Sequence, residues 1–241
     1  LHGGTVVRGM GGAPDVPGGP DGSYDLVLRV LHDGGAGGRT DRALLDDLGE
    51  EGFVPERADG TTRVTACGQR GLLYGLFHLV RLGEDAFRGE RPSEAHRPAT
   101  DLRMLDHWDN VAVHPVMGQV ERGYAGGSLF WQDGRARADT ERVRAYGRLL
   151  AACGVNAVSV NNVNVHEAEA HLLTDRVGEV ARIADALRSY GVRTHLSVNF
   201  ASPVLLGGLP SADPLDEAVC EWWAEAARGV YAVVPDFGGF V

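Results

Sequence analysis

A rhythm of short apolar runs and helical patterns repeats from Asp101 to the end of the chain and limits the folds open to it. Four apolar runs alternate with longer segments of helical spacing, and two of those segments stop at a glycine, Gly154 and Gly191. Apolar runs separated by helices predict βα units, whose consecutive strands lie parallel and are buried on both faces. The sequence therefore predicts an α/β fold for this half.

The expected elements of this half follow from the same pattern. We expect strands within residues 101–108, 155–164, 192–203 and 236–241, and helices within residues 139–154, 177–191 and 213–234. Each expected strand is apolar where it starts and polar where it ends.

The first half of the chain has a different organisation. Residues 1–22 are rich in Gly and Pro and predict a flexible lead-in without regular structure. Residues 23–97 hold strand-like runs and one apolar helical pattern that ends at Gly83, which together predict a small α+β domain. Residues 98–241 form the predicted α/β part.

Charge and composition exclude several classes of partner. The chain has no lysine, and its 23 arginines face 33 acidic residues for a formal charge of −10. This balance argues against a nucleic-acid partner, because cations supply most of that affinity. We expect no membrane partner either, since no apolar run is long enough to span a bilayer. The cellular compartment, cytoplasmic or secreted, stays undetermined.

Polar residues gather where the expected parallel strands end. Carboxyl ends of parallel strands meet at one edge of a sheet, and that edge is where such folds bind ligands. Amides and a carboxylate there suit a ligand covered in hydroxyl groups, and Trp108 could stack on a sugar ring. Asparagine is also a common turn former, so any single position has a structural alternative. The polar residues at this edge are Asp109, Asn110, Asn161, Asn162, Asn164 and Asn199.

A metal or nucleotide site has little support in the sequence. His166 and His171 are five residues apart, whereas two imidazoles reach one face of a metalloprotease helix when they are four apart. No G-x-G-x-x-G spacing follows a strand, and the three cysteines are scattered. We therefore expect no cofactor and no metal.

Five segments resemble the α-glucuronidases of glycoside hydrolase family 67. They read RMLDHWDN, ERGYAGGSLF, GVNAVSVNNVN, LSVNFASPVLLGGLPSADPLD and VPDFGGF, in this order within residues 102–241. The resemblance implies a (β/α)8 barrel that removes 4-O-methylglucuronic or glucuronic acid from xylo-oligosaccharides in xylan breakdown. It also implies inverting hydrolysis of the α-1,2 linkage without a cofactor, by two carboxyl groups.

The same resemblance implies roles for named residues. Trp108 would pack against the glucuronic acid and Val163 would lie near its 4-O-methyl group, while Glu121 and Arg122 would line the site from a loop. The asparagines Asn161, Asn162 and Asn164 would shape the pocket floor. Asp106 stands where the family usually has asparagine, and residues 111–120 form a longer linker than the family has.

The resemblance places the catalytic acid and base after Val241, so we expect no catalytic residue in this chain. It also leaves four strands of a barrel of eight. We expect a fragment of a longer enzyme, inactive alone, with Val158, Val160, Leu196 and Val198 facing an open barrel interior. A homodimer of the full-length enzyme is left open.

Two other functions remain open from the sequence alone. One is a non-catalytic carbohydrate-binding or regulatory fragment, which would share the pocket residues and lack the carboxyl groups. The other is a related barrel glycosidase, such as a hexosaminidase-like enzyme, with a similar first domain. Carboxylates at later strand ends would distinguish these functions.

Overall fold

The computed structural model describes residues 5–9, 24–30, 48–113 and 127–241. The chain divides into two compact units, residues 1–101 and 102–241. Each unit is a mixed α/β structure with its own sheet, and each is considered by itself.

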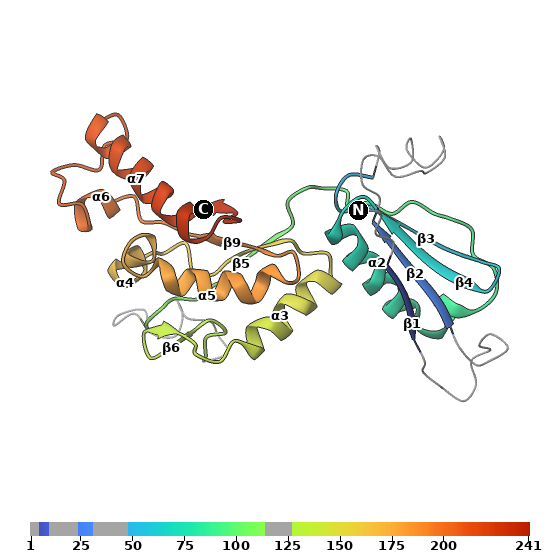
Figure 1. The fold of residues 1–241 in the computed structure, drawn as a ribbon. Coiled ribbons are helices and arrows are strands. Elements are labelled where there is room, and N and C mark those ends of the chain that lie inside the picture. Colours follow the sequence, from blue (N-terminus) through green and yellow to red (C-terminus); the bar gives the residue numbers. More distant parts are fainter. Residues whose placement is uncertain (1–4, 10–23, 31–47, 114–126) are drawn as a thin grey trace. The chain divides into compact units, whose positions relative to one another are not determined.

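The first unit is a four-stranded sheet with one long helix against it (Figure 1). The sheet order is β1-β2-β4-β3, in which only the β2–β4 pair is parallel. The elements are β1 (Thr5–Gly9), β2 (Tyr24–Val30), β3 (Phe53–Ala58), β4 (Thr61–Ala66), α2 (Gln69–Leu82) and the 3₁₀ turn η1 (Gly83–Phe87). The predicted helix is confirmed, and Gly83 follows it with a φ of 57°.

Strand β1 corrects the prediction that residues 1–22 carry no regular structure. The expectation was wrong for residues 5–9, which pair antiparallel with β2 over five positions. The segment TVVRG holds β-branched residues, which favour strands, and the neighbouring strand supplies the backbone partners. The glycines and prolines that guided the prediction lie mainly in residues 9–20.

The second unit is an α/β structure built on a parallel sheet of order β5-β8-β9-β10 (Figure 1). All three strand pairs of this sheet are parallel, which confirms the predicted parallel strands. The elements are β5 (Met104–Asp106), β6 (Trp131–Gln132), β7 (Arg135–Ala136), α3 (Glu141–Ala152), β8 (Ala157–Ser159), α4 (Glu167–Ala170), η3 (His171–Leu173), α5 (Val177–Arg188), β9 (Arg193–Leu196), α6 (Ser202–Leu205), α7 (Glu217–Val233) and β10 (Gly239–Phe240).

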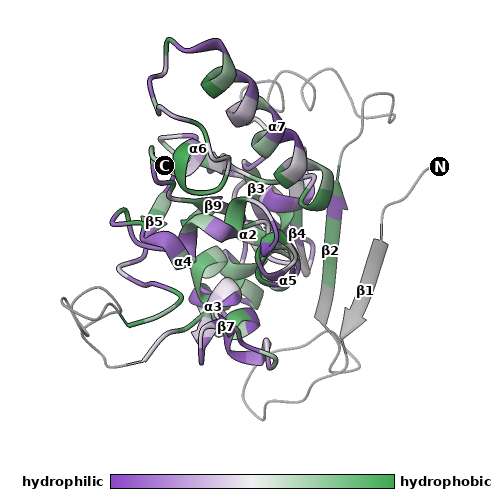
Figure 2. Ribbon diagram, turned by 90° about the vertical axis from the view of Figure 1, so that its left-hand side faces the viewer, coloured by the Kyte–Doolittle hydropathy of each residue, from purple (hydrophilic) through white to green (hydrophobic). Residues whose placement is uncertain are grey.

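The three long helices of this unit form where the periodicity predicts them. Gly154 and Gly191 follow α3 and α5 with φ values of 77° and 69°, a conformation that glycine adopts without strain. Helix α7 begins later than its apolar pattern because Asp216 caps it, accepting a bond from the Ala218 N–H at 3.0 Å. Hydrophobic and hydrophilic residues alternate along α7 (Figure 2). Within the described residues, no helix combines the length and apolar composition needed to cross a membrane.

The apolar residues of the parallel strands face the helices. Val158, Val160 and Leu196 are fully buried in one core with side chains of α3, α5 and α7, and Val198 packs against it. The expectation that these four residues face an open barrel interior was therefore wrong. Because side chains alternate along a strand, the opposite face carries Ser159, His195 and Ser197 instead.

A short hairpin, β6–β7, was not expected from the sequence. Its turn is Asp133-Gly134, and both residues have positive φ (50° and 74°), the signature of a type I′ turn. The Asp-Gly pair was the available signal.

Glu179 of α5 holds this hairpin. Its carboxylate accepts bonds from the Ala136 N–H at 2.5 Å and from Arg135 Nη1 at 3.0 Å. Burial raises the pKa of Glu179, but hydrogen bonds from Arg176, Ala136 and Arg135 outweigh burial and lower that pKa to about 2. The carboxylate therefore stays charged and fixes the hairpin to α5 near neutral pH.

Replacement of Leu196 by alanine tests which face of the sheet is packed. Leu196 is 1% exposed in the helix-facing core, so we expect Leu196→Ala to lower the free energy of unfolding by about 2–5 kcal/mol. Leu149→Ala, at a leucine of α3 that is 58% exposed, is the control and should change it by less than about 0.5 kcal/mol. Equal small losses in urea unfolding would contradict the assigned face.

Candidate functional site

Three loops leave the carboxyl edge of the parallel sheet, and the predicted site residues that the structure describes lie on them. The β5 loop covers residues 107–113, the β8 loop residues 160–166 and the β9 loop residues 197–201. The loops differ in sequence, but each carries either buried asparagine side chains or the backbone groups to which those side chains hydrogen-bond. Bonds between these loops fix the geometry of the edge.

Asn161 joins the β8 and β9 loops. Its Nδ2 donates to the Ser197 carbonyl at 3.0 Å, and its Oδ1 accepts from the Ser197 N–H at 3.1 Å. These are the donor and acceptor that a peptide group would present, so the side chain continues the sheet pairing beyond the last strand residues. Asn161 is fully buried, as is Ser159, whose hydroxyl bonds to the Asn161 carbonyl at 3.0 Å.

Two more bonds join the β5 and β8 loops. The Asn162 N–H donates to the Asp109 carbonyl at 2.5 Å, and Asn110 Nδ2 donates to the Asn164 carbonyl at 3.2 Å. Asn162 also accepts the Asn164 N–H through Oδ1 at 2.9 Å, which closes a tight turn around Val163. These bonds hold residues 109–110 beside residues 162–164.

Asn199 joins the β9 loop to the β8 loop. Its Nδ2 donates to the Val165 carbonyl at 2.8 Å, while its Oδ1 accepts from the Ala201 N–H at 2.8 Å. The second bond lies at the start of α6, so the same side chain also shapes the entry to that helix. Asn199 is half-buried.

Trp108, Val163 and Asn164 are the exposed members of the set. Trp108 is 44% exposed and Val163 is 51% exposed, although both are neighbours of fully or nearly fully buried residues. Large apolar side chains that stay exposed on a rigid loop are candidates for ligand contact. The structure thus divides the predicted residues into exposed side chains and buried ones that bind the backbone.

Asp109 and Ser128 connect the β5 loop to the hairpin segment. The Ser128 hydroxyl donates to Asp109 Oδ2 at 2.6 Å and accepts from the N–H groups of Phe130 and Trp131 at 3.0 and 2.7 Å. Trp131 in turn donates from its indole Nε1 to the Val160 carbonyl at 3.0 Å. Ser128 was not among the predicted site residues, because only tertiary contacts bring it to Asp109.

His107 is a half-buried anchor of the β5 loop. Burial lowers the pKa of its imidazole, partly opposed by the hydrogen bond to the Ser159 carbonyl. Nδ1 lies 2.8 Å from that carbonyl oxygen, which can only accept, so Nδ1 carries the proton and Nε2 accepts from the Tyr146 hydroxyl at 2.8 Å. Both nitrogens of the neutral ring are used, which fits a structural histidine.

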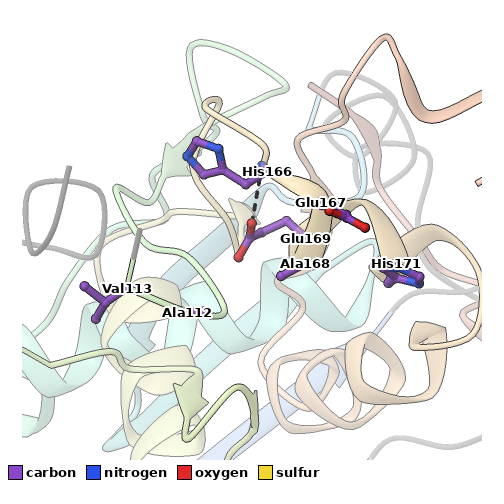
Figure 3. A pocket seen from close by; sticks show the side chains of 7 residues that line it. All are labelled: Ala112, Val113, His166, Glu167, Ala168, Glu169 and His171. Atoms are coloured by element: carbon purple, nitrogen blue, oxygen red, sulfur yellow. Dashed lines mark hydrogen bonds between the residues drawn. The ribbon is translucent and has the colours of Figure 1, made fainter. Parts of the chain in front are cut away.

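A pocket of about 470 Å³ lies beside the β5 and β8 loops (Figure 3). Glu169 lies between the two loops in this view, and a bond joins its carboxylate to the backbone of His166. The lining residues are Ala112, Val113, His166, Glu167, Ala168, Glu169 and His171. Sequence reasoning considered the histidines only as metal ligands and missed the pocket, which has no sequence signal of its own.

Two predicted residues, Glu121 and Arg122, lie outside the described residues. Two buried polar atoms at the site, Asn110 Oδ1 and Asn162 Nδ2, have no hydrogen-bond partner among the residues that the structure describes. Within those residues, no group of three or more His, Cys, Asp or Glu side chains is arranged to hold a metal ion.

Asn161 offers a test of the loop-joining role. We expect Asn161→Ala to lower the free energy of unfolding by about 2–4 kcal/mol, because it leaves the N–H and C=O of Ser197 without these partners. Asn164→Ala, in an exposed side chain of the same loop, should cost less than about 0.5 kcal/mol. A loss below about 0.5 kcal/mol for Asn161→Ala in urea unfolding would refute this role.

Comparison with known proteins identifies relatives over most of the chain. Alpha-glucuronidase A of Emericella nidulans is 42% identical over 207 residues, which are 86% of this chain and 24% of the relative. The alpha-glucuronidase of Hypocrea jecorina is 39% identical over 198 residues, which are 81% of this chain and 23% of the relative. The chain thus spans about a quarter of the length of these relatives.

Among solved structures, a GH138 enzyme targeting pectin rhamnogalacturonan II is similar in fold. Its TM-score is 0.53 at 14% identity, over 89% of this chain and 26% of the other. The model of the glycosyl hydrolase family 67 middle domain matches residues 87–241. With this match over more than half of its length, the chain belongs to glycosyl hydrolase family 67.

Proposed function

We propose that this chain is the glycone-binding part of an α-glucuronidase. The reaction is inverting hydrolysis of the α-1,2 linkage that joins 4-O-methylglucuronic or glucuronic acid to a xylo-oligosaccharide. Relatives named alpha-glucuronidase, near 40% identity over most of the chain, support this activity. Inverting hydrolysis needs a carboxylic acid and a carboxylate base, and the part proposed for this chain is to bind and orient the sugar.

We propose that the four parallel strands belong to a (β/α)8 barrel. Their chain order equals their order in the sheet, and the core of apolar strand residues lies on the helix side. Both features are those of consecutive βα units in such a barrel. The proposed domain limits are residues 23–97 for the α+β domain and 98–241 for the barrel part.

The proposed site rests on one observation. Two apolar side chains are exposed on two loops, and hydrogen bonds of buried groups hold these loops together. Trp108 offers a flat apolar face for the uronic acid ring, and Val163 offers a small apolar surface for a methyl group. Asn164, exposed beside Val163, would bind a sugar hydroxyl. Asp109, Asn110, Asn161, Asn162 and Asn199 would shape the site, and Glu121 and Arg122 would line it.

The proposed partner is a small-molecule or oligosaccharide substrate of the aldouronic acid type. The chain's charge of −10 makes a polyanion such as nucleic acid a poor alternative. A homodimer of the complete protein stays a prediction.

Release of glucuronic acid from aldotriouronic acid tests the activity. The complete protein that contains residues 1–241 should release glucuronic or 4-O-methylglucuronic acid, and proton NMR of the product should show inversion at the anomeric carbon. Release with retention, or release of N-acetylglucosamine from chitobiose in place of the uronic acid, would overturn the proposal.

Trp108→Ala tests the stacking face. Loss of a ring contact worth about 1.4 kcal/mol should lower kcat/KM on aldotriouronic acid about tenfold. Tyr231→Ala is a matched control, since Tyr231 on α7 is an aromatic residue of similar exposure, 43% against 44%. Kinetics that are equal for the two variants would show that Trp108 does not contact the sugar.

A further inference from the structure

Glu169 is a buried carboxylate placed between two of the loops that carry the proposed site. It belongs to the short helix α4 and is 3% exposed. Its oxygens bond to different loops: Oε1 accepts from the Val111 N–H at 2.9 Å, and Oε2 accepts from the His166 N–H at 3.3 Å. Figure 3 shows the carboxylate pointing toward the β8 loop from the first turn of α4.

The two donors are close in sequence to the exposed side chains of the site. Val111 follows Trp108 by three residues, and His166 follows Val163 by three residues. Val111 is itself fully buried, so the end of the β5 loop is held at that point by packing and by the carboxylate together. One side chain therefore constrains the loop of Trp108 and the loop of Val163.

The hydrogen-bond donors of Glu169 differ from those of Glu179, which is also buried. Glu179 accepts bonds from two arginines, Arg135 and Arg176, as well as from a backbone N–H. Among the residues that the structure describes, no arginine forms an ion pair with Glu169, and its two observed donors are backbone N–H groups. The contribution of Glu169 is therefore the geometry of two hydrogen bonds, one accepted by each oxygen.

We propose that Glu169 is a positioning residue that sets the relative placement of the Trp108 and Val163 loops in the sugar site. The inference rests on the proposed function for its kinetic consequence. Glu169 acts through the backbone at Val111 and His166, and it is not proposed to touch the substrate.

The variant Glu169→Gln distinguishes the effect of the two hydrogen bonds from the effect of side-chain size. Glu169→Gln keeps the shape of the side chain but turns one acceptor oxygen into an amide donor. That donor would face either the Val111 N–H or the His166 N–H, so one loop loses its bond and meets a like group. The acid therefore cannot be replaced by its closest isostere without releasing one of the two loops.

Asn156→Ala is the matched control. Asn156 is also buried and accepts a backbone N–H, that of Arg103, through Oδ1 at 3.0 Å. It connects the same two strands, β5 and β8, at their amino ends, opposite to the loops. Its loss should destabilise the unit without moving the loops.

The test compares both variants in the complete protein. We expect Glu169→Gln to lower kcat/KM on aldotriouronic acid at least tenfold, and Asn156→Ala to leave it within about twofold of the wild type at a similar fall in Tm. Equal losses in the two variants, or a Glu169→Gln value within twofold of the wild type, would overturn the proposal. If Glu169→Gln does not fold, Glu169→Asp, which keeps both acceptor oxygens on a shorter side chain, takes its place with the same criteria.

Hydrogen–deuterium exchange separates this inference from the proposed function. If the wild-type protein releases no glucuronic acid, the proposed function fails. The role of Glu169 is still tested, because amide exchange reports on the loops without any enzymatic activity. We then expect Glu169→Gln to speed amide exchange at least tenfold in at least one of the segments 107–113 and 160–166, and Asn156→Ala to leave both segments unchanged. Unchanged exchange in both segments of Glu169→Gln would refute the positioning role.

Discussion

Two hydrogen bonds between the Asn161 side-chain amide and the Ser197 backbone hold the carboxyl edge of the parallel sheet together. Strand β8 ends at Ser159 and β9 at Leu196, so the backbone ladder stops one or two residues before this pair. Without the side chain, the N–H and C=O of Ser197 would lose these partners in a buried setting, which is costly. The amide supplies one donor and one acceptor, which is why a buried asparagine stands where an apolar residue would otherwise be expected.

Buried and half-buried polar side chains extend this principle to the other loops of the edge. Asn110, Asn199 and Glu169 each bind the backbone of a neighbouring loop, and Asp109 is tied to Ser128. Each bond removes freedom from a segment that has no regular structure. The exposed residues Trp108 and Val163 therefore sit on a rigid base, and a rigid base lowers the entropy lost when a ligand binds.

The two faces of the parallel sheet have different chemistry. The face toward α3 and α5 is apolar and fully packed, and the other face carries Ser159, His195 and Ser197. Burial lowers the pKa of the His195 imidazole, so the ring is neutral at neutral pH. In a closed (β/α)8 barrel this second face would be the interior, and our proposal of such a barrel implies an interior with polar character near its carboxyl end.

The local pattern of apolar and polar residues was enough to determine the long helices, the parallel strands and the position of the polar residues. Helical spacing and stop glycines located α3 and α5, and the apolar-to-polar change along each strand located Asn161, Asn162 and Asn199 at one edge. The resemblance to family 67 was also visible in the sequence, and the match over residues 87–241 confirms it. These features depend on residues close together in the chain, so a sequence contains them directly.

Other features were decided only by tertiary structure. Which face of β8 packs against the helices depends on a one-residue alternation that a short apolar run does not reveal, and so Val158 and Val160 were assigned to the wrong side. Ser128 and Glu169 bind the β5 loop, at Asp109 and Val111, from 19 and 58 residues away in the chain. The segment Thr5–Gly9 is a strand because the backbone of β2 pairs with it. The sequence by itself determined the long helices, the parallel strands and the polar chemistry at the ends of those strands. Only the packed chain decided which polar groups are buried to hold the loops and which are exposed, because burial is a property of the surroundings of a side chain and not of its type.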